Sequence, residues 1–174
     1  MNEPAAANVP EPSLLRIVLI GRRPRNTCVR IVVLVVACYI VFGFILLPIR
    51  IEGVSMQPTY HDRQIDFVNR LAYIKHEPRR GDVVSIMLAG RSVMYMKRIV
   101  GLPGETIAFS SGKLLVNGEI LTEPYVKSQC DWEIPPVTLG TNQYYVVGDN
   151  REMPEKNHEK GIAERRRIVG KVLL

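Results

Sequence analysis

The sequence of 174 residues contains little cysteine and histidine, and the few residues of each type are scattered. No Cys-x-x-Cys pair occurs, and the histidines show no metal-ligand spacing. A zinc or redox site is therefore not predicted, and we interpret the cysteines as small buried or membrane-embedded thiols. The residues concerned are Cys28, Cys38, Cys130, His61, His76 and His158.

Internal repeats are missing, and the charge excess is modest: 23 lysines and arginines face 17 acidic residues, a net charge of +6. The length gives room for one domain of ordinary size. Glycine and proline follow no period, which excludes a collagen-like chain. The arginines near the amino terminus form no basic stripe interleaved with aromatic residues. Nucleic acid is therefore not an expected partner.

Residues 31–47 form an apolar run of 17 residues without a charge. As a helix, this run with its flanks spans about 26 to 30 Å, which matches a bilayer core. Five arginines precede it, and the positive-inside bias places the amino terminus in the cytoplasm. We predict a cytoplasmic tail at 1–26, a transmembrane signal-anchor helix at 27–49 and an extracytoplasmic domain at 50–174.

The location predicted from this arrangement is the plasma (inner) membrane, crossed once, with the domain on the outer face. The alternative is a cleaved secretory signal, since an apolar stretch behind arginines is also typical of one. No small-x-small cleavage site follows the run, which favours the uncleaved anchor.

Beyond the run, short β-prone segments alternate with turn residues, which predicts a compact all-β domain, so that the whole chain is mostly β. Asn117-Gly118 lies between two apolar segments and predicts a small hairpin extension. We expect an irregular loop at 128–140, where two consecutive prolines occur. The candidate strands are at 67–68, 82–88, 92–100, 106–109, 113–116, 143–147 and 168–173.

A serine lies in a predicted tight turn soon after the apolar run. Gly53 and Pro58 bracket Ser55, and such a turn presents a hydroxyl beside backbone N–H groups that can hold an oxyanion. The alternative is an ordinary turn serine, and the local pattern does not separate the two.

Lys97 is the candidate general base. On a strand at 92–100 it shares a face with Tyr95 and Ile99, and burial there would lower the pKa of a lysine and give a neutral amine. The alternative is a lysine that reaches solvent from a strand end. His158 lies in a run of charges and no histidine has an apolar setting, so we prefer a Ser/Lys pair to a Ser/His/Asp triad.

Residues 146–151 read as a strand that ends in Gly-Asp-Asn-Arg. Asp149 and Arg151 are two residues apart, with Asn150 between them. We expect these residues to have a structural role, in which local hydrogen bonds and an ion pair pin the loop.

In combination, four segments resemble the conserved boxes of type I signal peptidases. They occur in the family's order and approximate spacing, and the resemblance covers roughly residues 25 to 174. The segments are GVSMQPT at 53–59, RGDVV at 80–84, YMKRIVGLPGE at 95–105 and GDNR at 148–151.

The resemblance implies a membrane-bound serine endopeptidase that removes signal peptides from translocated preproteins. By this likeness Ser55 is the nucleophile, and Lys97 is the general base and later the acid that protonates the leaving amine. Shallow apolar pockets would bind small residues at the first and third positions before the cut. The residues expected to help form these pockets are Ile51, Met56, Tyr95 and Met96.

No cofactor is expected, because a Ser/Lys dyad needs neither metal nor nucleotide. The implied partners are preprotein signal peptides and membrane lipid, with the secretion translocon as a further candidate. Many bacterial members carry a hydroxyl residue where this chain has Gly53. The oxyanion hole would then depend mainly on the backbone N–H of Ser55.

The last box departs further from the family's pattern. Pro154 stands where a serine is expected to orient the lysine, and Lys156 and His158 stand for the expected aspartate and arginine. We expect weaker positioning of the lysine, unless Asn157 or Glu155 substitutes from a shifted loop.

Two alternatives to a signal-cleaving enzyme follow. The first is a catalytically silent relative that binds signal or pilin-like segments in a secretion assembly, which the altered loop favours. The second is a self-cleaving regulator with a related Ser/Lys domain. A membrane helix, and no DNA-binding helix pair, precedes the β domain, which disfavours the regulator.

Overall fold

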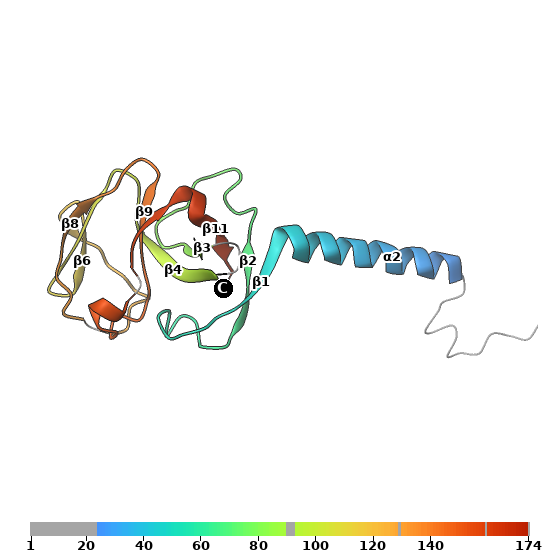
Figure 1. Ribbon diagram of the computed structural model, residues 1–174, viewed down its shortest axis with the longest axis horizontal. Coiled ribbons are helices and arrows are strands. Elements are labelled where there is room, and N and C mark those ends of the chain that lie inside the picture. The colour runs from blue at the N-terminus through green and yellow to red at the C-terminus, as the bar shows by residue number, and fades with distance from the viewer. Residues whose placement is uncertain (1–23, 90–92, 129, 159, 174) are drawn as a thin grey trace, which may run out of the picture. The chain divides into compact units, whose positions relative to one another are not determined.

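The computed structural model of the protein describes residues 24–89, 93–128, 130–158 and 160–173 (Figure 1). The chain divides into two compact units, one up to Val41 and one from Phe42. The first contains the helix α2 (Pro24–Ile40), and the second contains the β domain with all the predicted site residues. The fold is mostly β with an apolar N-terminal helix, as predicted.

The helix continues as one π-helical segment, η1 (Val41–Ile45). Residues Arg25–Ile45 are long and apolar enough to cross a membrane, and no other helix in the described part of the chain is. The prediction that the helix extends to residue 49 is wrong. Leu46–Arg50 instead form strand β1, where Pro48 is tolerated because an edge strand leaves one side of its backbone unpaired.

The β domain consists of two antiparallel sheets. In Figure 1, β6 and β8 of the smaller sheet gather on one side of β9, and β3, β11 and β2 of the larger sheet lie on the other. The larger sheet has the order β1 (Leu46–Arg50), β2 (Ile65–Asn69), β11 (Ile168–Val172), β3 (Val83–Ala89), β4 (Val93–Gly101), β9 (Gln143–Val147) and β10 (Gly161–Glu164). The smaller has the order β7 (Glu119–Ile120), β6 (Lys113–Val116), β5 (Thr106–Ser110) and β8 (Ile134–Thr138).

The predicted hairpin at Asn117-Gly118 is confirmed, since it joins β6 to β7 with both turn residues at positive φ. The expectation of an irregular loop at 128–140 is wrong in part. Residues Ile134–Thr138 form β8, which pairs with β5. Prolines are tolerated there because β8 is the edge strand of its sheet, and an edge strand leaves one side of its backbone without strand hydrogen bonds.

Apolar side chains of the described residues form three buried clusters, and one of them contains residues that flank the predicted nucleophile in the sequence. That cluster contains Ile51, Met56, Tyr60 and Val68, with Tyr60 only 1% exposed. Burial of this apolar surface stabilises the turn that carries Ser55, since burial contributes about 25 cal/mol per Å². The turn is therefore anchored on both sides of the serine.

Candidate active site

Ser55 and Lys97 meet although they are 42 residues apart in the sequence. The Nζ of Lys97 donates a hydrogen bond to the Oγ of Ser55 at 2.7 Å. Lys97 lies on β4, where it pairs with Val84 of β3, and it is only 2% exposed. An interior strand and burial together give the amine a fixed position against the hydroxyl.

The turn that carries Ser55 is held by backbone hydrogen bonds at both ends. The N–H of Ile51 donates to the carbonyl of Gln64 at 2.9 Å, and the N–H of Tyr60 donates to the carbonyl of Met56 at 3.0 Å. The N–H of Gly53 donates to the carboxylate of Asp62 at 2.8 Å. Gly53 has a φ of 100°, which favours glycine at this position.

A cleft of about 640 Å³ opens beside the two side chains. Ser55 and Lys97 line it together with the four residues predicted to bind substrate, Ile51, Met56, Tyr95 and Met96. Other parts of its wall come from β1, the start of the turn and the ends of β3 and β4, namely Pro48, Ile49, Arg50, Glu52, Gly53, Ser85, Leu88 and Met94.

The residue after Lys97 belongs to a different environment. Arg98 lies outside the residues that line the cleft and donates from Nε and Nη2 to the two carboxylate oxygens of Asp149, at 2.8 and 2.6 Å. Asp149 also accepts a hydrogen bond from the Thr59 hydroxyl at 2.5 Å. Burial alone would lower the pKa of Arg98, but the hydrogen bonds and charge of Asp149 outweigh it and raise that pKa.

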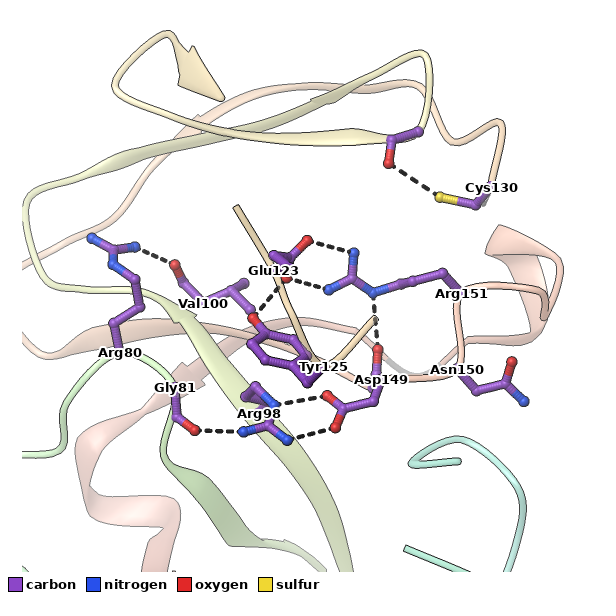
Figure 2. A network of polar contacts seen from close by, with 12 residues as sticks. Arg80, Gly81, Arg98, Val100, Glu123, Tyr125, Cys130, Asp149, Asn150 and Arg151 are labelled. Carbon is purple, nitrogen blue, oxygen red and sulfur yellow. Dashed lines mark hydrogen bonds and ion pairs between the residues drawn. The ribbon is translucent and has the colours of Figure 1, made fainter. Parts of the chain in front are cut away.

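The expected ion pair between Asp149 and Arg151 is wrong. Figure 2 shows Arg151 directed at Glu123, to which it donates from both Nη atoms at 3.0 and 2.6 Å, while Asp149 takes Arg98. The hydroxyl of Tyr125 donates to Glu123 at 2.7 Å, and its ring lies under the Arg98 guanidinium at 4.0 Å. A local hydrogen bond is present, from Arg151 Nε to the carbonyl of Gly148. The loop is thus pinned mainly by residues distant in sequence.

Asn150 contacts the turn that carries Ser55 directly. Its backbone N–H donates to the carbonyl of Ser55 at 3.0 Å, and its Nδ2 donates to the carbonyl of Val54 at 3.1 Å. Two peptide groups next to the serine are therefore fixed by one residue at the end of β9.

The sequence of the chain is similar to those of known proteins. The family described as signal peptidase, peptidase S26, matches residues 25–174. The chain belongs to the signal peptidase family. "Signal peptidase I S" of Bacillus subtilis (strain 168) is 35% identical over 152 residues, which are 80% of this chain and 82% of that one. "Signal peptidase I" of Bacillus licheniformis is 31% identical over 151 residues, 80% of this chain and 81% of that one.

A solved structure of a signal peptidase I from Enterococcus faecalis V583 is 23% identical and has a TM-score of 0.46, with 56% of this chain and 97% of that chain covered. The family predicted from the four sequence motifs is confirmed by the family match and the Bacillus relatives. So is the prediction of an enzyme of the signal peptidase I type.

In this chain the loop after Arg151, where Pro154 stands in place of the expected serine, has exposed side chains at Pro154, Glu155 and Asn157. The carboxylate of Glu155 pairs with Lys160 at 3.1 Å. The substitution of Glu155 or Asn157 for the missing serine therefore receives no support from the structure.

The prediction that no histidine has an apolar setting is wrong for His158. Its side chain is buried, 4% exposed, with Nε2 3.0 Å from the carbonyl oxygen of Asn150. Its ring meets Trp132 edge-on, with centroids 4.8 Å apart. Sequence reasoning missed this residue because Glu155, Lys156 and Lys160 surround it in sequence. The sequence signal that could have found it is the nearby tryptophan, which needs a partner in the core.

Proposed function

We propose that this chain is a membrane-bound serine endopeptidase that cleaves signal peptides from translocated preproteins, with Ser55 as nucleophile and Lys97 as general base. The observation that carries the proposal is the hydrogen bond of 2.7 Å between Nζ and Oγ at the wall of the cleft. That distance is within the range needed for direct proton transfer from a hydroxyl to an amine.

Burial of Lys97 supports the role of base. Removing a lysine from water disfavours the ammonium form and favours the neutral amine. The amine then takes the proton of Ser55 while Oγ attacks the scissile carbonyl, and an acyl-enzyme forms when the ammonium returns the proton to the leaving amine. The leaving amine is the new amino terminus of the mature protein. Water, activated by the amine of Lys97, then hydrolyses the ester, which releases the signal peptide and restores the Ser55 hydroxyl.

The backbone N–H of Ser55 is the proposed donor to the oxyanion. The carbonyl of Val54, in the same peptide group, accepts hydrogen bonds from the Gln57 N–H and from Asn150 Nδ2, both at 3.1 Å. In a planar trans peptide the N–H points opposite to the carbonyl, so these bonds also fix the direction of the donor. A donor fixed before the substrate arrives stabilises the tetrahedral intermediate without reorganisation.

The substrate class follows from the cleft and the family. Ile51, Met56, Tyr95 and Met96 give the cleft apolar wall beside the dyad, which suits small side chains at the first and third positions before the cut. The names of the Bacillus relatives support signal peptides as substrates.

The helix Arg25–Ile45 supports a membrane-bound state by its length and composition. We place the amino terminus in the cytoplasm and the β domain on the outer face, because the arginines precede the helix. Membrane lipid, and the translocon that delivers preproteins, are the proposed partners.

The test is cleavage of a preprotein with an Ala-x-Ala site by the full chain in detergent. Wild type is compared with Ser55→Ala and Lys97→Ala across a pH series, and Lys75→Ala, at an exposed lysine, is the matched control. We expect cleavage by wild type and the control alone, with a rate that rises as one group loses its proton. Binding of the preprotein without cleavage by wild type would instead support the silent relative.

A further inference from the structure

His158 is connected to the nucleophile turn by two consecutive hydrogen bonds. The Nε2 of His158 lies 3.0 Å from the carbonyl oxygen of Asn150. A carbonyl oxygen only accepts, so Nε2 carries the proton and donates. The backbone N–H of Asn150 in turn donates to the carbonyl of Ser55 at 3.0 Å.

Gly148 provides a second connection through packing. A Cβ added to Gly148 would lie 2.2 Å from the carbonyl oxygen of Ser55 and 2.7 Å from Cε1 of His158. The glycine therefore fits between the nucleophile turn and the imidazole ring without space for a methyl group. Close-packed contacts of this kind transmit a displacement of the ring to the turn.

The ring itself is fixed from the other side. Trp132, which is 2% exposed, meets it at an interplanar angle of 72° and packs against Phe109 with centroids 5.5 Å apart. The backbone N–H of His158 donates to the carbonyl of Glu155 at the end of the short helix η2 (Glu155–Asn157). The imidazole thus joins the core of the smaller sheet to the end of β9.

We propose that His158 is a positioning residue, which holds Ser55 against Lys97 through the backbone of Asn150. The inference rests on the proposed role of Ser55 as nucleophile. The histidine of the altered loop would thus support the backbone of Ser55 through Asn150. The effect is expected on the chemical step more than on substrate binding, because His158 is not among the residues that line the cleft.

The experiment compares His158→Met with His158→Gln in the full chain in detergent. Methionine fills a similar volume but cannot donate, whereas the glutamine amide can donate to the same carbonyl. We expect His158→Met to lower kcat at least about tenfold with KM little changed, because small misplacements of reacting groups reduce rates strongly. His158→Gln should recover most of the rate. His76→Met is the matched control, at an exposed histidine whose Nδ1 also contacts a carbonyl, and it should match wild type.

A second readout separates this inference from the proposed function. Amide hydrogen exchange of residues 146–151 should be faster in His158→Met than in wild type and His158→Gln, whether or not the chain cleaves a signal peptide. If wild type cleaves nothing, the proposed function fails and the exchange rates decide the inference. Unchanged kcat and exchange in His158→Met, or equal losses in both variants, would overturn it.

Discussion

Two neighbouring basic residues on β4, Lys97 and Arg98, are both buried but have different partners. Lys97 lines the cleft and donates to the hydroxyl of Ser55, whereas Arg98 donates to both oxygens of the carboxylate of Asp149. Successive side chains of a strand point to opposite faces, so one residue step separates the two settings. The carboxylate of Asp149 stabilises the charged guanidinium of Arg98.

The difference suggests separate tasks for the two residues: Lys97 for the proposed reaction, and Arg98 for support of the structure around it. Asp149 also accepts a hydrogen bond from the hydroxyl of Thr59, which lies four residues after Ser55. Arg98 therefore helps to hold the segment that presents Ser55 to Lys97, although it does not line the cleft. The permanently charged Arg98 has a supporting role in this geometry, whereas in the proposed mechanism Lys97 is the residue that loses its proton.

The largest effect is expected from Lys97→Arg, which makes the two neighbouring residues alike. Arginine stays protonated, so it cannot accept the serine proton, and loss of a general base lowers kcat about 10² to 10⁴-fold. The readout is preprotein cleavage, with the thermal unfolding midpoint as the check on folding. Lys75→Arg, at an exposed lysine, should cleave like wild type. Substantial cleavage by Lys97→Arg would mean that position 97 acts through its charge and not as a base.

The next effect is expected from Asp149→Asn, which removes the charged partner of Arg98. A buried guanidinium without its carboxylate destabilises a fold by about 3 to 5 kcal/mol. Urea unfolding measures this loss. Glu77→Gln is the control, since Glu77 pairs with Arg165 but its side chain is 71% exposed, and such pairs contribute at most about 1 kcal/mol. Equal losses of unfolding free energy in the two variants would show that the buried ion pair of Asp149 contributes no more than the exposed ion pair of Glu77.

A smaller, pH-dependent effect is expected at Asp82, next to the Gly81 carbonyl to which Arg98 donates. Burial alone would raise the pKa of Asp82, but hydrogen bonds from Lys171, the Arg79 N–H and the Tyr73 hydroxyl outweigh it and hold that pKa below its ordinary 3.8. The folded state therefore keeps the carboxylate ionised to lower pH than the unfolded state does. The resulting stability is complete well above pH 3.8 and is lost as pH falls through the folded pKa.

Asp82→Asn should accordingly unfold at lower urea concentration than wild type at neutral pH, by about 1 to 3 kcal/mol. The difference should shrink as the pH falls below 3.8. Asp131→Asn, at an exposed aspartate, should show neither effect. A difference independent of pH would indicate that packing, and not ionisation, is what the substitution removes.

Local pattern was sufficient for the parts of the site that depend on strand alternation and turn residues. The apolar neighbours of Lys97 and the glycine and proline around Ser55 indicated which residues could meet. The pairing of Asp149 could not be predicted in this way, because Arg98 lies 51 residues away and only the pairing of β4 with β9 brings it near. Arg151 was closer in sequence, and that proximity was misleading.

Local sequence also fails to predict strands and buried residues that are stabilised by contacts with segments distant in sequence. The end of the apolar run forms strand β1 because it hydrogen-bonds to β2. In the same way, β8 forms in spite of two prolines because it hydrogen-bonds to β5. His158 is buried because Trp132, 26 positions earlier, packs against it. Charge density near a residue in sequence therefore did not determine its burial in the fold.

The smallest effect is expected at the wall of the cleft, from Met96→Ala, which changes neither Lys97 nor Arg98. Met96 lines the cleft beside Lys97, and its truncation to alanine removes apolar wall and enlarges the cleft. We expect cleavage after small residues to change little, and the preference for alanine over valine before the cut to fall about tenfold, the discrimination that a methylene group or two supplies. Competition between the two preproteins measures it, with Ile120→Ala, 62% exposed and outside the cleft, as the control. An unchanged preference would place Met96 away from the bound peptide, leaving Ile51, Met56 and Tyr95 to select the side chain.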